Sequence, residues 1–329
     1  MIFPDSYKCL SINTFHYNDY NIIPIRYSDR IKIMKWRNEQ LFHLRQKEIL
    51  ASKIQDTYFK EVILKLFHKK NPSQILFSYF YKEKLIGYGG LVHIDWTNLN
   101  AEISFIMDTS LEKKYFNLNW SVFLKLLEKP AFNVLGLNKI YTYAFDLRSH
   151  LYDCLENNNY IREARLKKHF LFENNFIDVV IHSKITPFTL RLANKNDCLT
   201  LFKWVNEKSV RKNSLNTKKI TMTEHKKWYS RKIKDPKTKI YILRNKNKDV
   251  AQIRFENINN MELIDYSVDP KYRGQGLGKI VILLGMKKLN SKNYIAQVKN
   301  DNIFSLKIFK SIGFEIISEK DSVTKFLKK

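Results

Sequence analysis

The strongest constraint on the fold of this chain is an internal repeat. The segment KWRNE at residues 35–39 recurs as KWVNE at residues 203–207. Asp29 and Asp197 stand seven residues before the two tryptophans, with apolar residues at helical spacing in between. Each segment therefore predicts the first helix of a domain, with an aspartate near the helix N-terminus.

Four further pairs of segments follow in the same order in both halves. They predict, in turn, a strand–turn–strand, a strand, a later strand, and a helix end that leads into a strand. The pairs are 75–91 with 240–255, 100–108 with 260–269, 139–146 with 294–301, and 154–161 with 308–317. Five matching elements in one order indicate a duplicated domain.

The two halves meet near HSKITPF, residues 182–188. A β-rich run ends at Ile185 and Pro187 precedes a new strand, so we predict domains at 1–186 and 187–329. The order of elements in each half predicts a mixed α/β fold of three layers, in which helices flank a mostly antiparallel mixed sheet.

The stretch RGQGLGK follows a predicted strand and opens an apolar helix from Leu277 to Leu289. Glycine allows positive φ and a close approach of the backbone, and the amides of a helix start attract anions. The glycine spacing fits neither the nucleoside-triphosphate loop nor the dinucleotide pattern. We predict a phosphate cradle, with two cations at its rim, formed by Arg273, Gly274, Gln275, Gly276, Leu277, Gly278 and Lys279.

The second half resembles the GNAT superfamily of N-acetyltransferases over most of residues 188–329. The acetyl-CoA signature of that superfamily, Q/R-x-x-G-x-G/A, is matched by Arg273, Gly276 and Gly278. A second landmark, N-x-x-[AS]-x-x-x-Y-x-x-x-G-F, is matched except at its tyrosine by Asn302, Ser305, Phe309, Gly313 and Phe314. The resemblance implies direct transfer of an acetyl group from acetyl-CoA to an amine in a ternary complex.

The resemblance also implies roles for residues around the loop. The glycine-loop amides would hold the pyrophosphate of the coenzyme, and the strand end 266–269 would pair with its pantetheine arm. The amide of Val268 would polarise the thioester carbonyl and stabilise the oxyanion. Asn302 and Ser305 would contact the arm.

One position departs from the family pattern. The family often has a tyrosine where this chain has Phe309, and that tyrosine protonates the departing thiolate. Phenylalanine has no proton to give. Either the thiolate leaves unassisted, or another group such as Tyr266 or Tyr229 donates.

The first half has no counterpart of the glycine loop. The equivalent segment, TSLEKKYFNLNW at 109–120, lacks glycine and carries Glu112, whose carboxylate would repel a pyrophosphate. The half still resembles the same superfamily at 36–38, 85–91 and 101–108. We expect a degenerate copy that no longer binds acetyl-CoA, and that packs on the active copy, shapes its cleft or binds a second ligand.

The acceptor site is expected next to VRKNSLNTKKITMTEHKKWY, residues 210–229. In the family, the first two helices wall the acceptor, and this stretch resembles acetyltransferases of nucleotide-linked amino-sugars. Arginine binds a diphosphate through two parallel bonds, and an aromatic ring stacks on a sugar or base. The candidates for binding the acceptor are Arg211, Asn213, Ser214 and Trp228, and the alternative for Trp228 is a core position.

The transfer requires a neutral amine, so a base must remove a proton. His225 is the first candidate because histidine titrates near neutral pH. The alternative for His225 is an ordinary position on a helix surface. Asp265, on the central strand where the family often keeps its base, is the second candidate.

The charge of the chain favours an anionic partner. It has 58 Lys and Arg against 32 Asp and Glu, a formal net charge of +26. These cations are spread from end to end rather than gathered in a stripe, so we expect no nucleic-acid partner.

Other features bear on the compartment. Cys9, Cys154 and Cys198 show no metal-ligand spacing, so we expect no metal and a reducing compartment. We find no signal peptide and no long apolar run, so we expect a cytoplasmic protein without a membrane partner. A homodimer is possible.

Three functions stay open at this point. The first is acetylation of a nucleotide-linked amino-sugar for surface glycan biosynthesis. The second has the same chemistry on a protein N-terminus or other peptide amine. The third is a module that binds coenzyme or nucleic acid without turnover.

Overall fold

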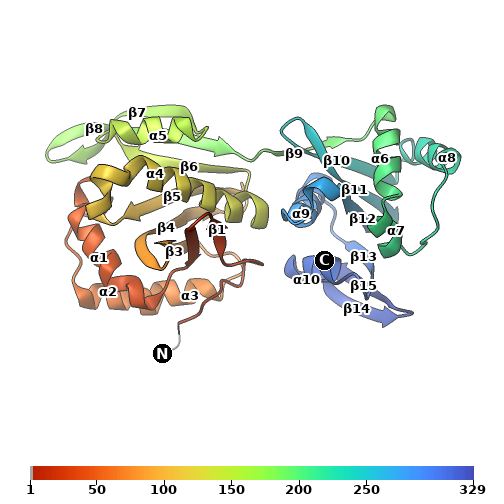
Figure 1. Ribbon diagram of the computed structural model, residues 1–329, viewed down its shortest axis with the longest axis horizontal. Coiled ribbons are helices and arrows are strands. Elements are labelled where there is room, and N and C mark those ends of the chain that lie inside the picture. Colours follow the sequence, from red (N-terminus) through yellow and green to blue (C-terminus); the bar gives the residue numbers. More distant parts are fainter. Residues whose placement is uncertain (1–2) are drawn as a thin grey trace. The chain divides into compact units, whose positions relative to one another are not determined.

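A computed structural model describes residues 3–329, and the chain divides into two compact units at the bond between Thr186 and Pro187. Each unit is built on its own sheet (Figure 1). Both sheets are mostly antiparallel and are flanked by helices, which confirms the expected mixed α/β fold.

The first unit has an eight-stranded sheet in the order β1-β2-β3-β4-β5-β6-β8-β7, in which only β5 and β6 pair in parallel. Its strands are β1 (Phe15–Tyr17), β2 (Tyr20–Pro24), β3 (Ile75–Tyr81), β4 (Lys84–Asp95), β5 (Asn100–Met107), β6 (Lys139–Phe145), β7 (Ile161–Phe172) and β8 (Asn175–Ile185). Its α-helices are α1 (Arg30–Glu39), α2 (Ser52–Tyr58), α3 (Leu64–Phe67), α4 (Thr109–Glu128) and α5 (Ser149–Asn157). Phe105 of β5 stacks on Phe123 of α4 with ring centroids 4.0 Å apart, so α4 seals the core over the centre of the sheet.

The second unit repeats this plan with seven strands in the order β14-β15-β13-β12-β11-β10-β9, and only β12 and β13 are parallel. Its strands are β9 (Phe188–Leu192), β10 (Thr238–Asn245), β11 (Lys248–Ile258), β12 (Met261–Val268), β13 (Tyr294–Lys299), β14 (Glu315–Lys320) and β15 (Val323–Lys328). Its helices are α6 (Cys198–Val205), α7 (Lys208–Asn213), α8 (Met222–Lys232), α9 (Leu277–Leu289) and α10 (Ile303–Ser311). Helices α9 and α10 cover one face of the sheet, and α6, α7 and α8 lie on the other (Figure 1).

The repeated aspartates hold the start of the first helix in each unit. Asp29 accepts two hydrogen bonds from Arg26, of 2.7 and 2.8 Å, and Asp197 accepts two from Arg191, both of 2.7 Å. Both carboxylates are buried, and a forked arginine pair is a geometry in which a buried carboxylate is well compensated. The spacing that revealed the duplication is therefore explained by an ion pair common to both units.

The repeated asparagines hold the segment that follows each first helix. In the first unit, Asn38 donates to Leu50 O at 2.9 Å and accepts from Leu50 N at 2.8 Å. In the second unit, Asn206 makes the same two bonds with Ile220, both of 2.8 Å. Each asparagine side chain thus bonds both the backbone N–H and the backbone C=O of one residue, which lies more than ten positions further along the chain.

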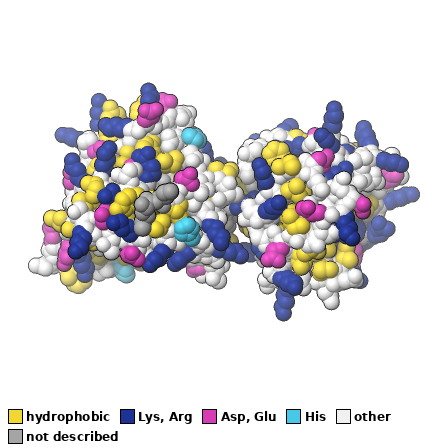
Figure 2. Space-filling model, turned by 90° about the horizontal axis from the view of Figure 1, so that it is seen from below, with side chains coloured by type: hydrophobic (Ala, Val, Ile, Leu, Met, Phe, Trp, Pro, Cys, Tyr) yellow, Lys and Arg dark blue, Asp and Glu magenta, His cyan; other side chains and the backbone are white. Residues whose placement is uncertain are grey.

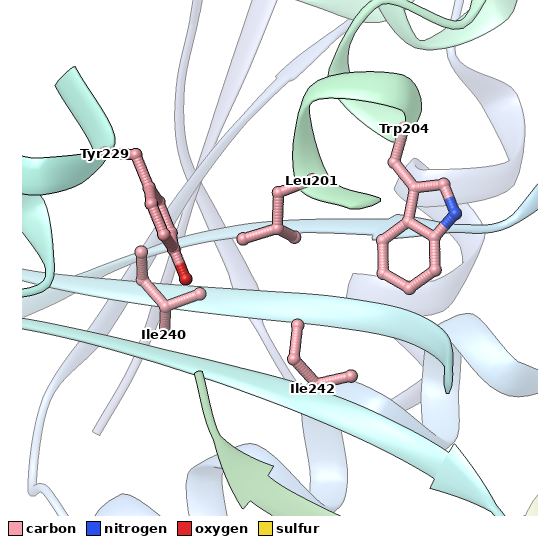
Figure 3. Packing of buried hydrophobic residues seen from close by; sticks show 5 residues of the cluster. All are labelled: Leu201, Trp204, Tyr229, Ile240 and Ile242. Carbon is pink, nitrogen blue, oxygen red and sulfur yellow. The ribbon is translucent and has the colours of Figure 1, made fainter. Parts of the chain in front are cut away.

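The repeated tryptophan of the second unit joins the core to the site. Trp204 packs with Leu201, Tyr229, Ile240 and Ile242 between α6, α8 and β10 (Figure 3). Its indole Nε1 donates to Asp269 Oδ2 at 3.0 Å, at the point where β12 ends. Core packing therefore fixes the position from which the glycine loop departs.

Candidate active site

The centre of the second unit contains an opening between two parallel strands. The parallel pairing of β12 with β13 ends at Ile264 and Ala296, although β12 continues to Val268. On the other side of β12, the Asp269 amide donates to Val250 O at 2.9 Å. Because successive residues of a strand direct their amides to opposite edges, the Val268 amide faces the opening. An extended ligand can pair with this edge of β12.

The glycine loop lies directly after this strand end. Asp269 accepts from the Lys271 amide at 2.9 Å and starts a short turn, and α9 then begins at Leu277. Gly274 and Gly276 both have φ of 76°, in the left-handed region that glycine adopts without strain. A Cβ on Gly274 would meet nothing within 4 Å, so the loop presents bare backbone to open space.

The first turn of α9 fits a phosphate group. Gly276 occupies the N-cap position and supplies no side-chain acceptor for the amides of that turn. The first amides of a helix have no partner within the helix and carry its positive dipole end. The residues present therefore fit a phosphate group, and the binding of a coenzyme pyrophosphate, which the family resemblance implies, stays a prediction.

Lys279 and Arg273 are expected as cations at an open rim of the loop, but the structure places both differently. Lys279 is only 8% exposed. Arg273 donates to Glu207 Oε2 at 2.7 Å and to Ser209 Oγ at 2.6 Å, and its Nε donates to Val268 O at 3.2 Å. The Arg273 charge is therefore already paired, and this arginine joins the glycine loop to the segment between α6 and α7.

Glu207 is a site residue that the motif analysis missed. Burial opposes its charge, but hydrogen bonds from Arg273 and Ser209 lower the pKa of Glu207 to about 2. Its counterpart in the first unit, Glu39, accepts from Thr109 Oγ1 at 2.6 Å at the start of α4. The sequence signal for this residue is the glutamate that ends both repeated pentapeptides. In both units this glutamate contacts the segment that follows the central strand, β5 or β12.

Tyr266 lies on the face covered by α9 and α10. Its hydroxyl and that of Ser305 are 2.8 Å apart, and its ring centroid is 6.0 Å from that of Phe309. A Cβ on Gly278 would come within 3.1 Å of the Tyr266 ring, so the missing side chain makes room for the phenol. Burial raises the pKa of Tyr266 to about 12, so the hydroxyl keeps its proton at neutral pH.

Asn302 and Ser305 are placed by the start of α10. The Asn302 side chain caps this helix by accepting from the Ser305 amide at 3.2 Å. The cap directs the Ser305 hydroxyl to Tyr266. Asn302 and Ser305 are the two residues predicted to contact the pantetheine arm. The Asn302 side chain is used as a helix cap, and the Ser305 hydroxyl is hydrogen-bonded to the Tyr266 hydroxyl.

Asp265 lies on the opposite face of β12, because side chains alternate along a strand. Its side chain is 52% exposed, and its contacts are long, with Gln252 Nε2 at 3.3 Å and Arg254 Nη2 at 3.6 Å. This face is the one covered by α6, α7 and α8. Asp265 is therefore an accessible carboxylate on the expected acceptor side.

His225, the first candidate for the base, has the contacts of a core residue. It is 2% exposed, and its Nε2 lies 3.1 Å from the carbonyl oxygen of Cys198. Its ring packs 5.5 Å from Phe202 and 6.0 Å from Tyr229. Burial lowers the pKa of His225 and favours the neutral ring. This geometry supports a role in packing, and a role as base stays a prediction without structural support.

The acceptor candidates on α7 are mostly engaged in the local fold. Arg211 donates to the carbonyl oxygens of Val205, Asn216 and Lys218, at 2.6, 3.2 and 3.2 Å. It also donates to Ser214 Oγ at 2.9 Å. The expected binding of a diphosphate by Arg211 would have to break these bonds, so Arg211 is better described as the residue that shapes this loop.

The remaining two candidates differ in availability. Trp228 is partly buried against the core cluster, and the Arg254 guanidinium lies 5.1 Å from its ring centroid. Asn213 ends α7 and is partly exposed. Asn213 therefore stays accessible, whereas one ring face of Trp228 already has a cationic partner.

The surface charge and the absence of certain groups among residues 3–329 bear on the expected nucleic-acid, membrane and metal partners. Figure 2 shows Lys and Arg side chains scattered over one face of the protein with acidic side chains between them. Within residues 3–329, no helix is long and apolar enough to cross a membrane, and no three His, Cys, Asp or Glu side chains are grouped to hold a metal ion.

Comparison with known families places the chain. A family model described as the acetyltransferase (GNAT) domain matches residues 22–181, and one described as the acetyltransferase (GNAT) family matches residues 202–314. The chain thus belongs to the GNAT acetyltransferases and carries two domains of this family in tandem. It is an N-acetyltransferase that uses acetyl-CoA, as the resemblance to this family implies.

Solved structures of similar fold are distant in sequence. The spermidine N-acetyltransferase of Vibrio cholerae, solved with CoA and spermine, is 16% identical and covers 51% of this chain and 96% of its own, with a TM-score of 0.46. A domain from Methanocaldococcus jannaschii is 19% identical and covers 43% of this chain and 96% of its own, with a TM-score of 0.38. No curated protein matches the sequence.

Proposed function

We propose that the second unit alone carries out acetyl transfer, with the coenzyme in the opening between β12 and β13. The observation that carries this proposal is the glycine-lined helix start of α9 beside the free edge of β12. When bound there, acetyl-CoA supplies the reactive thioester. The Val268 amide, which faces the opening, would donate to the thioester carbonyl oxygen and stabilise the charge that develops on it.

The proton steps are assigned to the two faces of β12. On the acceptor face, Asp265 would take a proton from the amine, because its carboxylate is exposed and loosely paired. On the coenzyme face, the Tyr266 hydroxyl would hold a proton for the leaving sulfur, with Ser305 fixing its direction. Tyr266 would thus replace the family tyrosine that is absent at Phe309.

The first unit lacks the features that support this assignment. Helix α4 starts at Thr109, directly after β5, and Asp108 caps it by accepting from the Ser110 amide at 3.1 Å. A carboxylate already lies where a pyrophosphate would have to bind, and Glu112 adds a second one in the first turn. We infer that this unit does not bind acetyl-CoA through α4.

The charge of the acceptor wall favours an anionic acceptor. Residues 205–229 hold seven Lys or Arg and two Glu. Such a surface attracts an amine that carries negative groups elsewhere and repels a polycation. A nucleotide-linked amino-sugar, with one amine and a diphosphate, has this chemistry and is the acceptor class that we propose. The diphosphate would be attracted by the lysines of this wall rather than by Arg211.

The test measures thiol release from acetyl-CoA with a panel of UDP- and dTDP-linked amino-sugars, with spermidine and a peptide amine as the other acceptor classes. The variant Gly276→Asp places a carboxylate at the helix start, and Gly276→Asn is its uncharged control. Asparagine and aspartate both tolerate the left-handed region, so the pair isolates the charge.

We expect turnover with amino-sugar nucleotides that Gly276→Asp abolishes and Gly276→Asn largely retains. Turnover with spermidine or the peptide alone would overturn the acceptor class but leave the site in place. Equal activity of both variants would overturn the assignment of the coenzyme to the glycine loop. Coenzyme binding without turnover on any acceptor of the panel would overturn the proposed acceptor class.

A further inference from the structure

The first unit contains a pocket at the position that corresponds to the coenzyme loop of the second unit. The pocket has a volume of about 460 Å³, within the range of sites for small organic molecules. It is formed by the first turns of α4, by the start of α5 with the segment before it, and by the segment that follows α1. Its lining residues are Phe42, Thr109, Glu112, Lys113, Phe116, Leu147, Arg148 and His150.

The walls combine one apolar surface with a nearly buried cation. Phe42, Phe116 and Leu147 form the apolar surface. The Arg148 side chain is only 13% exposed. Burial lowers the pKa of Arg148 to about 10, so the guanidinium is still protonated at neutral pH.

Arg148 has one carboxylate partner, Glu112, at a long distance. Its Nη1 lies 3.5 Å from Glu112 Oε1 and 3.2 Å from His43 Nε2. His43 brings no charge, because burial and the nearby Arg148 lower the pKa of His43 to about 3. Both of these contacts are made by Nη1, and the Arg148 guanidinium carbon also lies 5.9 Å from the ring centroid of Phe116. A guanidinium has five N–H donors, so Arg148 keeps donors for an acceptor with two oxygens in addition to these contacts.

We propose that this pocket binds a small organic monocarboxylate with an apolar body. The carboxylate would take two parallel hydrogen bonds from Arg148, and the apolar body would lie against Phe42, Phe116 and Leu147. Lys113 at the rim adds attraction for an anion. Glu112 limits the charge of the ligand, because it would repel a pyrophosphate or a dicarboxylate more strongly than a single carboxylate. The proposal does not depend on the function of the second unit.

The experiment uses the full chain and titrates hydrocinnamate, followed by calorimetry or ligand-observed NMR. The uncharged amide of the same acid is the ligand control. We expect the acid to bind and the amide to bind at least about tenfold more weakly. Arg148→Lys keeps the charge but loses the planar fork, and should weaken binding of the acid about tenfold. Glu112→Gln removes the competing carboxylate and should tighten binding several-fold.

The outcomes separate a binding site from a structural ion pair. If Arg148 only stabilises the fold, both variants lower the melting temperature and neither changes binding in the stated direction. Equal binding of acid and amide, or no binding of the acid to the wild type, overturns the proposal. Should Arg148→Lys fail to fold, the tightening by Glu112→Gln still decides the question.

Discussion

Replacing Tyr266 by phenylalanine removes only the hydroxyl group, and so tests whether this hydroxyl donates the proton to the leaving sulfur. The hydroxyl oxygen lies 2.8 Å from Ser305 Oγ, so the substitution also removes a partly buried hydrogen bond. A bond of this kind contributes about 1 kcal/mol to stability. Ser305→Ala removes the same bond but leaves the phenol in place. The two variants should therefore unfold at similar denaturant concentrations.

Their kinetic effects should differ. A positioned general acid contributes about 10² to 10⁴ in rate, so we expect Tyr266→Phe to lower kcat/KM at least about a hundredfold. Ser305→Ala only loosens the direction of the hydroxyl, and a loss of about fivefold to tenfold is expected, on the scale of one neutral hydrogen bond. The difference between the two variants measures what the proton itself supplies.

The pH dependence follows from the pKa of Tyr266. The acid form is the active one, and burial raises its pKa from 10.0 to about 12. The phenol therefore stays protonated throughout pH 6–9, and it should give no falling limb in the rate there. Stability linked to the neutral phenol is present below pH 10 and is lost as the pH rises toward about 12.

The decisive assay varies the leaving group. A thioester of an aromatic thiol with a low pKa needs no protonation when its sulfur departs. Tyr266→Phe should lose much less activity with such a thioester than with acetyl-CoA, both assayed with the acceptor found in the panel. The same loss with both thioesters, or equal losses in Tyr266→Phe and Ser305→Ala, would refute the role of the phenol as an acid.

Two further substitutions test the acceptor face and the loop. Asp265→Asn should lower kcat at least about tenfold at pH 7 with little change in the KM for acetyl-CoA. The loss of kcat should shrink at high pH, where the amine loses its proton unaided. A loss of kcat that is constant across pH argues against a role of Asp265 as base. Glu207→Gln should lower stability by no more than about 1 kcal/mol at pH 7, because the pair with Arg273 is partly exposed. Since the pKa of Glu207 falls from 4.5 to about 2, its contribution is present above pH 4.5 and lost as the pH falls toward 2; denaturant unfolding of both proteins across that range should show the difference disappear.

The sequence predicts the architecture well because the signals that define it are local and occur twice. The strands at 75–81 and 84–95 and those at 238–245 and 248–258 lie within the predicted strand–turn–strand segments, apart from a few end residues. A turn flanked by apolar runs needs no distant partner to be recognised. Two independent copies of each pattern also average out the ambiguity of any single one.

The separation of β12 from β13 could not be read from the sequence. Segments 261–268 and 294–299 are continuous strands with no glycine or proline where their pairing stops. The register of two parallel strands depends on how the connecting helix packs across the sheet. The resemblance to the GNAT family supplied the expectation of a ligand edge at Val268, and local patterns did not.

The burial of His225 is the opposite case, because a local pattern does predict it. His225, Trp228 and Tyr229 follow one another at spacings of three and one, so they share one face of a helix. A face with two large aromatic residues predicts burial against the sheet. The imidazole lies in that buried face, where its nitrogen contacts a carbonyl oxygen. Chemistry by residue type was the weaker guide here, and helical periodicity the better one.

The two units differ where a ligand would bind and agree where the scaffold is held. Asn38 and Asn206 make the same pair of backbone hydrogen bonds in the two units, and each buried aspartate is paired with an arginine in the same forked geometry. The segments that start α4 and α9 have opposite chemistry, since Asp108 caps the first and Gly276 leaves the second bare. A duplicate that had lost all function would need the scaffold contacts for stability, but it would not need a largely buried arginine in a pocket. Burying a charge costs free energy, and a bound carboxylate would offset that cost at Arg148. This cost at Arg148 is the physical reason to look for a ligand in the first unit.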